Sequence, residues 1–165
     1  MKPCERSTFN NPLDGDKTSV EENHSVFSLT LPCHPRSLRE VRRLTQEIGQ
    51  KTALDMKDMF QLELVMDEAC MNAVDHGSSI NPEMKFQVCF RIEKTRIVIL
   101  VRDFGGKPFN PEYFERLAEK KTWGSGGRGI HIIKQIMDEV MFFQRPGEST
   151  LLTMVKYLSH AKTTS

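Results

Sequence analysis

Two polar side chains four residues apart give the first indication of chemistry in this sequence. Glu68 and Asn72 belong to the segment Glu-Ala-Cys-Met-Asn-Ala, and on a helix residues i and i+4 share one face. An amide oxygen suits Mg²⁺, which takes oxygen ligands and usually keeps several waters beside substrate phosphates. A carboxylate on the same face can orient or deprotonate an attacking hydroxyl. Taken alone, the pair would equally suit the solvated edge of a helix.

A second polar motif, Asp103-Phe104-Gly105, follows a strongly apolar segment. An aspartate at the end of a strand can accept a hydrogen bond from a base amine, and a nearby glycine lets a ligand lie close to the backbone. The alternative is an ordinary turn, because Asp and Gly are favoured in turns for local reasons. Together with Glu68 and Asn72, the motif suggests a nucleotide site assembled from separate segments.

The third motif is a cluster of glycines ahead of a segment with a helical pattern. It consists of Gly124, Gly126, Gly127 and Gly129, with Arg128 between the last two. The spacing fits G-x-G-x-x-G, but that dinucleotide fingerprint needs a strand directly before it and an acid about 20 residues later. Here a helix end or loop precedes the glycines, and Asp138 comes too early. Since glycines that open a helix can offer backbone N–H groups to phosphates, we expect a lid over a triphosphate, with Lys120, Lys121 or Arg128 as candidate charge partners. A plain flexible loop is the alternative.

Apolar periodicity predicts the elements that must position these motifs. Alternating or continuous apolar runs predict strands over residues 26–31, 85–91, 96–102, 140–144 and 150–158. Helical spacing predicts helices from Pro35, over 55–76, over 109–121 and over about 130–137. Gly77 is expected to end the helix that carries Glu68 and Asn72. The predicted fold class is therefore α+β, with a mixed, mostly antiparallel sheet and helices on one face.

Length and composition restrict the class of protein. A chain of 165 residues is sufficient for one domain with a real core, and we expect it over residues 26–160, after a disordered or loosely docked extension of residues 1–25. The net charge of +1 argues against a protein that mainly binds nucleic acid, which usually carries a basic stripe. The four cysteines have no zinc-type spacing, so thiols in a reducing cytoplasm are expected. No apolar run approaches the roughly 20 residues that a membrane span needs.

In this order, the three motifs resemble those of the GHKL ATPase superfamily, which includes gyrase, MutL and the histidine kinases. The matching residues are Glu68-x-x-x-Asn72-Ala-x-x-His76-Gly77, then Asp103-x-Gly105, then the glycines before a helix. The small size and the run Ile-Met-Asp-Glu-Val after the glycines are most similar to the anti-sigma regulatory factors, the serine kinases of bacterial partner-switching systems. The resemblance covers roughly residues 26–158 and implies the Bergerat-type α+β sandwich.

The resemblance also implies a role for each motif at bound Mg-ATP. Asn72 would be the Mg²⁺ ligand, and Glu68 would be the general base or orient the incoming hydroxyl. Asp103 would accept a hydrogen bond from the adenine amine, next to Gly105, and Thr150 would lie near the adenine. The residues expected to hold the triphosphate are Gly124, Gly126, Gly127, Arg128 and Gly129.

The activity that the resemblance implies is transfer of the γ-phosphate of ATP to a serine or threonine of a STAS-type antagonist protein. A sigma factor would be a further partner, and a homodimer is expected by the same resemblance. The alternative that the sequence leaves open is a nucleotide-dependent anti-sigma or partner-binding module without significant kinase activity.

Overall fold

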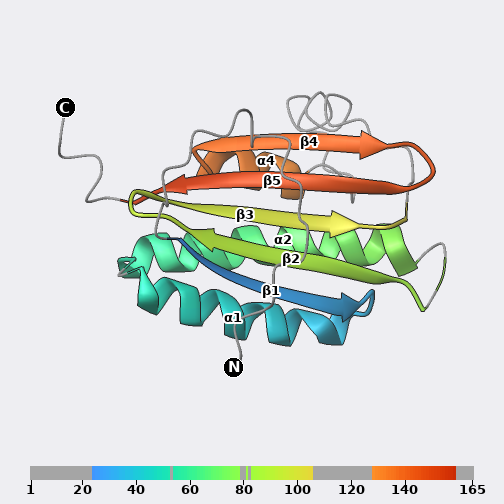
Figure 1. Cartoon of the computed structure of the whole chain (residues 1–165), viewed down its shortest axis with the longest axis horizontal. Helices are drawn as coiled ribbons and strands as arrows, with labels where there is room; N and C mark the ends of the chain where they lie inside the picture. The colour runs from blue at the N-terminus through green and yellow to red at the C-terminus, as the bar shows by residue number, and fades with distance from the viewer. Residues whose placement is uncertain (1–23, 53, 79–80, 82, 106–127, 159–165) are drawn as a thin grey trace.

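The computed structural model describes residues 24–52, 54–78, 81, 83–105 and 128–158. In this part of the chain, helices lie against one face of a five-stranded sheet with the strand order β1-β2-β3-β5-β4 (Figure 1). All four strand pairs are antiparallel. The predicted α+β sandwich is confirmed. The expected N-terminal extension and the helix expected over 109–121 fall almost wholly outside the described residues.

The strands follow the apolar alternation of the sequence. They are β1 (Ser25–Pro32), β2 (Lys85–Ile92), β3 (Arg96–Asp103), β4 (Glu139–Arg145) and β5 (Ser149–Tyr157). In β3, every residue from Ile97 to Val101 is buried, as expected of a central strand covered on both faces. Gly147, in the turn between β4 and β5, has a φ of 76°, a left-handed conformation that favours glycine.

The helical layer consists of the short 3₁₀ turn η1 (Pro35–Ser37) and the helices α1 (Leu38–Lys51), α2 (Met56–Ser78) and α4 (Arg128–Ile136). The helix expected from Pro35 begins as the 3₁₀ turn and becomes α-helical at Leu38. The prediction that Gly77 ends the second helix is wrong, because α2 continues to Ser78. Glycine lowers helix stability by only about 1 kcal/mol, and it stops a helix only where the chain takes a left-handed turn.

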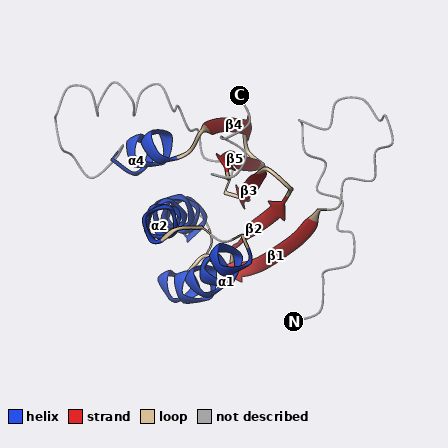
Figure 2. Ribbon diagram, turned by 90° about the vertical axis from the view of Figure 1, so that its left-hand side faces the viewer, coloured by secondary structure: helices blue, strands red, loops and turns tan. Residues whose placement is uncertain are grey.

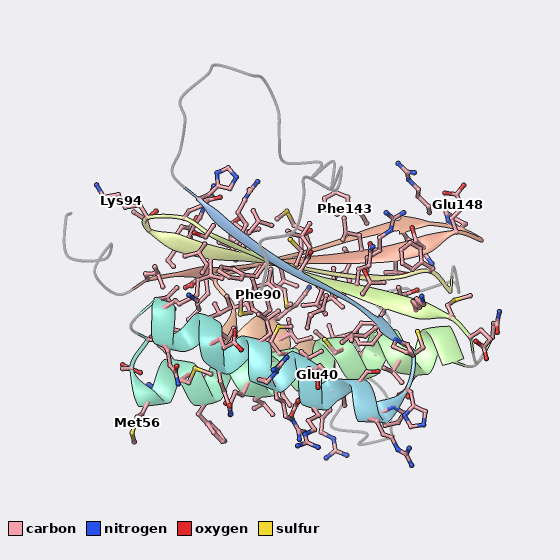
Figure 3. The ribbon with its side chains drawn as sticks, turned by 60° about the horizontal axis from the view of Figure 1, so that its bottom comes forward. Glu40, Met56, Phe90, Lys94, Phe143 and Glu148 are labelled. Atoms are coloured by element: carbon pink, nitrogen blue, oxygen red, sulfur yellow. The ribbon has the colours of Figure 1, made fainter. Side chains whose placement is uncertain are left out.

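The core lies between the two layers. Seen along the strands, α2 occupies the middle of the helical layer, with α1 on one side and α4 on the other (Figure 2). The buried stripe expected on α2 is confirmed by the burial of Leu62, Val65, Met66, Ala69 and Ala73. Phe90 of β2 is fully buried against this layer (Figure 3). The central position of α2 brings its polar residues next to the ends of β3 and β5.

The three cysteines in the described part of the chain, Cys33, Cys70 and Cys89, are buried free thiols. Burial is the main reason that the pKa of Cys70 is raised far above its ordinary value, and the negative charge of Asp67 adds to the effect. A thiol with a raised pKa stays protonated and is a poor nucleophile. Among the described helices, none has the length and apolar character that a membrane crossing requires.

Candidate functional site

A small cavity of about 30 Å³ lies between α2 and the sheet. It is lined by eight residues from α2, β3, β4 and β5: Ala69, Asn72, Ala73, Val101, Asp103, Phe142, Thr150 and Leu152. Three polar positions singled out in the sequence, Asn72, Asp103 and Thr150, therefore meet at one place. They come from three elements that are far apart in the sequence.

Strand register explains why Asp103 and Thr150 reach the same cavity. The two residues are paired across β3 and β5, and two positions along, Val101 is paired with Leu152. Because side chains in a strand alternate between faces, all four project toward α2. Phe142 of β4 is paired with Leu152 and extends the apolar wall. The result is a mostly apolar cavity with a few convergent polar groups, which is the usual character of a small-molecule site.

The two polar side chains on the sheet differ in their hydrogen bonding. Asp103 is 5% exposed, and its Oδ1 accepts a hydrogen bond of 3.0 Å from the backbone N–H of Gly105. This local bond fixes the orientation of the carboxylate. Thr150 is also 5% exposed, but its Oγ1 is buried without a hydrogen-bond partner. A buried unpaired polar atom destabilises a protein by about 1–3 kcal/mol. The unpaired Thr150 hydroxyl therefore indicates that a polar ligand atom binds here.

The negative charge of Asp103 extends to a thiol behind the cavity wall. The pKa of Cys33 is raised, first by burial and second by the charge of Asp103. The Sγ of Cys33 donates to the carbonyl oxygen of Ala73 at 3.8 Å, and Ala73 lines the cavity. The carboxylate is thus a source of negative potential in a largely apolar site, which suits a hydrogen-bond donor on the ligand.

Glu68 lies one helical turn before Asn72 but does not line the cavity. It faces the first turn of α4, where a Cβ added to Gly129 would overlap its Oε2 and lie 3.3 Å from its Cδ. The side chains of Glu68 and Asn72 are both half-buried. The predicted shared edge of α2 therefore runs from the cavity, at Asn72, to the N-terminus of α4, at Glu68.

Of the other site residues predicted from the sequence, the structure describes some and not others. Gly105 is half-buried directly after Asp103, and Arg128 is exposed as the first residue of α4. Gly124, Gly126 and Gly127 lie outside the described residues. Sequence reasoning did not assign the apolar lining, which comprises Ala69, Ala73, Val101, Phe142 and Leu152. Both C-terminal strands are almost continuously apolar, so no local signal distinguished Phe142 and Leu152 from their neighbours.

The residues present fit an adenine nucleotide with a magnesium ion. A cavity of this volume admits a water molecule or the edge of a base rather than a whole purine, so it matches the inner end of a base site. Nowhere in the described ranges do three His, Cys, Asp or Glu side chains form a group that could hold a metal. A metal near Asn72 would therefore take most of its ligands from phosphates and water, as Mg²⁺ commonly does.

Comparison with known proteins agrees with this geometry. Residues 31–156 match the model of the histidine kinase-like ATPase domain family. The serine-protein kinase RsbW of Bacillus velezensis is 25% identical over 154 residues, which cover 86% of this chain and 89% of that protein. The anti-sigma F factor of Bacillus cytotoxicus is 28% identical over 108 residues, which cover 64% of this chain and 74% of that protein.

A solved structure supports the fold independently. The crystal structure of the SiaB-SiaC complex from Pseudomonas aeruginosa contains a chain that superposes with a TM-score of 0.61 at 10% identity, covering 78% of this chain and 88% of that one. At this identity the likeness concerns the fold alone. The family match spans most of the sequence, including the cavity and the Glu68–Gly129 contact. The chain therefore belongs to the histidine kinase-like ATPase domain family.

Proposed function

We propose that this protein is an ATP-dependent serine/threonine kinase that phosphorylates a STAS-type anti-sigma factor antagonist in a partner-switching system. The observation that carries the proposal is the convergence of Asn72, Asp103 and Thr150 on one cavity, with Glu68 one turn away on the same helix. The names of two relatives, a serine-protein kinase and an anti-sigma factor, support a protein as the phosphate acceptor, and the resemblance to the anti-sigma regulatory factors implies that it is of the STAS type. A sigma factor is the second proposed partner, and the proposed assembly is a homodimer.

Adenine recognition follows from the chemistry of the cavity. The Asp103 carboxylate would accept a hydrogen bond from the exocyclic amine of adenine, whereas the O6 of guanine would be repelled by it. The Thr150 hydroxyl, buried without a partner, would gain a hydrogen bond to the base or to a water beside it. Val101, Phe142 and Leu152 would enclose the apolar faces of the base. The site should therefore prefer ATP over GTP.

Phosphate transfer would depend on positioning and on charge neutralisation. A magnesium ion, when bound, would neutralise charge on the phosphates, with Asn72 as its ligand from the protein. The glycines from Gly124 to Gly129 and Arg128 would hold the triphosphate through backbone N–H groups and positive charge. Glu68 would accept the proton of the attacking serine or threonine hydroxyl at its carboxylate.

The second candidate function is a nucleotide-dependent binding module without significant kinase activity. The relative named as an anti-sigma factor favours it, because sequestering a sigma factor requires a protein surface and not phosphate transfer. Both candidates share the adenine site. They differ in whether Glu68 takes part in chemistry.

The test uses γ-labelled ATP, the full chain and each STAS-domain protein from the same genome. We expect label on a serine or threonine of one STAS protein, and its loss with Glu68→Gln, which keeps the size of the side chain but removes the base. ATP binding by Glu68→Gln should match that of the parent protein in calorimetry. Transfer of label to the STAS protein by Glu68→Gln as by the parent protein would show that Glu68 is not the base. Tight ATP binding by the parent with no labelled STAS protein would leave the binding-module function in its place.

A further inference from the structure

The contact between Glu68 and Gly129 joins the two helices that border the site. Gly129 is the second residue of α4 and is buried. An added Cβ would overlap the Oε2 of Glu68, and it would also lie 3.3 Å from Cδ and 3.4 Å from Cβ of the same side chain. The carboxylate therefore occupies the space that any side chain at position 129 would fill.

Backbone conformation does not require a glycine at this position. Gly129 lies within a regular helix and has no positive φ; among the described glycines, only Gly147 does. Glycine within a helix is less favourable than alanine by about 0.8–1 kcal/mol. Glycine at position 129 therefore lowers the stability of the helix locally. The Glu68 carboxylate explains why a glycine nevertheless stands there, because it occupies the space of a side chain.

Helix α4 cannot readily move aside to admit a side chain. Ile133 is fully buried and Ile130 is 4% exposed, so the apolar face of α4 is packed against the core. At its other end, the Lys156 ammonium donates a 2.9 Å hydrogen bond to the carbonyl oxygen of Ile136. The Glu68 carboxylate, by contrast, is the far end of a flexible side chain. It is the group that would give way.

The position of the carboxylate also has an electrostatic reason. The first turn of a helix carries backbone N–H groups without partners in the helix and a partial positive charge that favours anions. The Glu68 carboxylate, which lies beside Gly129 in this turn, is therefore in an electrostatically favourable position.

We infer that Gly129 is a positioning residue for Glu68: the absence of a side chain there keeps the carboxylate on the first turn of α4, where it can receive the proton of the incoming hydroxyl. The inference rests on the proposed function, in which Glu68 is the base. It gives Gly129 a second role beside the phosphate contact proposed for its backbone N–H, and it makes the geometry of the base dependent on α4.

The test compares Gly129→Ala with Gly49→Ala. Gly49 of α1 is a matched control, because it is also a buried helical glycine. An added Cβ there would overlap the Sδ of Met59, in the flexible side chain of a residue of α2. For each variant, four quantities are measured on the full chain: kcat for phosphate transfer, the Kd for ATP, the melting temperature, and the side-chain ¹³C resonance of Glu68, assigned through Glu68→Gln.

We expect Gly129→Ala to lower kcat by at least about 100-fold, within the range that a positioned general base contributes. Its Kd for ATP should stay unchanged, because alanine keeps the backbone N–H proposed to contact phosphate. Its melting temperature should not fall, and its Glu68 resonance should shift. Gly49→Ala should leave kcat and the Glu68 resonance as in the parent. A weaker ATP affinity with unchanged kcat would instead make Gly129 only a phosphate contact and overturn the inference, as would parental kcat and resonance in Gly129→Ala.

The resonance separates this inference from the proposed function. If the parent protein transfers no phosphate, the kinase proposal fails on that result alone. The resonance then decides the inference: a shift in Gly129→Ala but not in Gly49→Ala supports the positioning of Glu68 by Gly129, and an unchanged resonance refutes it.

Discussion

Asp103 and Thr150 are cross-strand partners in the antiparallel register of β3 and β5, and both line the cavity beneath α2. They are equally buried. Asp103 is oriented by the backbone N–H of Gly105, whereas the Thr150 hydroxyl has no partner. Among the described residues, the Asp103 carboxylate is thus oriented as an acceptor, while the Thr150 hydroxyl can still bond to a ligand or a water.

Thr150→Val should therefore have opposite effects on stability and on binding. Valine keeps the shape of threonine and removes the unpaired buried hydroxyl, so the free protein should gain up to about 1 kcal/mol in unfolding free energy. The affinity for ATP should fall by about five- to tenfold, because one hydrogen bond contributes about 1 kcal/mol net. Urea denaturation and calorimetry measure the two quantities.

Thr153→Val is the control for this substitution. Thr153 is fully buried on the same strand, and its hydroxyl also lacks a partner. Its cross-strand partner is Leu100, which belongs to the apolar cluster on the other face of the sheet. Thr153→Val should raise stability in the same way and leave ATP binding unchanged. Equal loss of affinity in both variants would mean that the effect of Thr150→Val does not come from the cavity.

Asp103→Asn should weaken ATP binding and reduce the preference for adenine. The amide oxygen of asparagine can still accept from the N–H of Gly105, so the local turn is retained, but a neutral acceptor binds the base amine less strongly than a carboxylate. Hydrogen bonds to charged groups contribute about 1.5–3 kcal/mol, so the affinity for ATP should fall at least about tenfold. Calorimetry with ATP and GTP measures both changes, and parental affinity for both nucleotides would dismiss the adenine role.

Most of the framework could be predicted because its signals are local. Alternation gave the strands to within one or two residues, and the stripe from Leu62 to Ala73 identified the buried face of α2. Motif order led to Asn72, Asp103 and Thr150, which the structure brings together. The helix end at Gly77 was predicted wrongly: α2 includes Gly77 and runs to Ser78, since glycine lowers helix stability by only about 1 kcal/mol.

The rest depends on contacts between distant segments. Nothing local to Phe142 shows that it faces Leu152 across β4 and β5 and so lines the cavity. Likewise, no spacing rule relates Glu68 to Gly129, which lie 61 positions apart in the numbering and touch only because α2 and α4 pack side by side. The glycine cluster suggested phosphate binding, and the packing of one of its members against a carboxylate is visible only in the fold.

Asn72→Ala should abolish the magnesium-dependent part of nucleotide binding. Asn72 lines the cavity and is the amide proposed as the metal ligand, while Asp103 and Thr150 still recognise the base in the variant. We therefore expect parental affinity for ATP in the absence of Mg²⁺ and no gain in affinity when Mg²⁺ is added. Calorimetry with and without Mg²⁺ measures this, and Asn72→Asp, which restores an oxygen ligand, should recover part of the gain. An undiminished response to Mg²⁺ in Asn72→Ala would exclude Asn72 as the ligand.

Lys156→Met should destabilise the protein through the C-terminal end of α4. Lys156 is 9% exposed; its Nζ donates to the carbonyl oxygen of Ile136 at 2.9 Å and lies 4.0 Å from the Oδ1 of Asp58 on α2. Methionine keeps most of the aliphatic volume but removes the donor and the charge. The gain from no longer burying an ammonium offsets part of the loss, so we expect a decrease of about 1–2 kcal/mol in unfolding free energy.

Hydrogen exchange can show where in the protein Lys156→Met loses stability, separately from how much stability it loses. Amides in the last turn of α4 should exchange with deuterium faster in Lys156→Met, since the final carbonyl of the helix has lost its donor and the turn frays. Lys94→Met is the matched control, because Lys94 is exposed in the turn between β2 and β3 (Figure 3). The unfolding free energy of this variant should stay within about 0.5 kcal/mol of that of the parent protein. If Lys156→Met behaves like Lys94→Met in both measurements, the ammonium does not hold α4, and the rigidity on which the Glu68–Gly129 contact depends must come from its apolar packing, in which Ile133 is fully buried in the core.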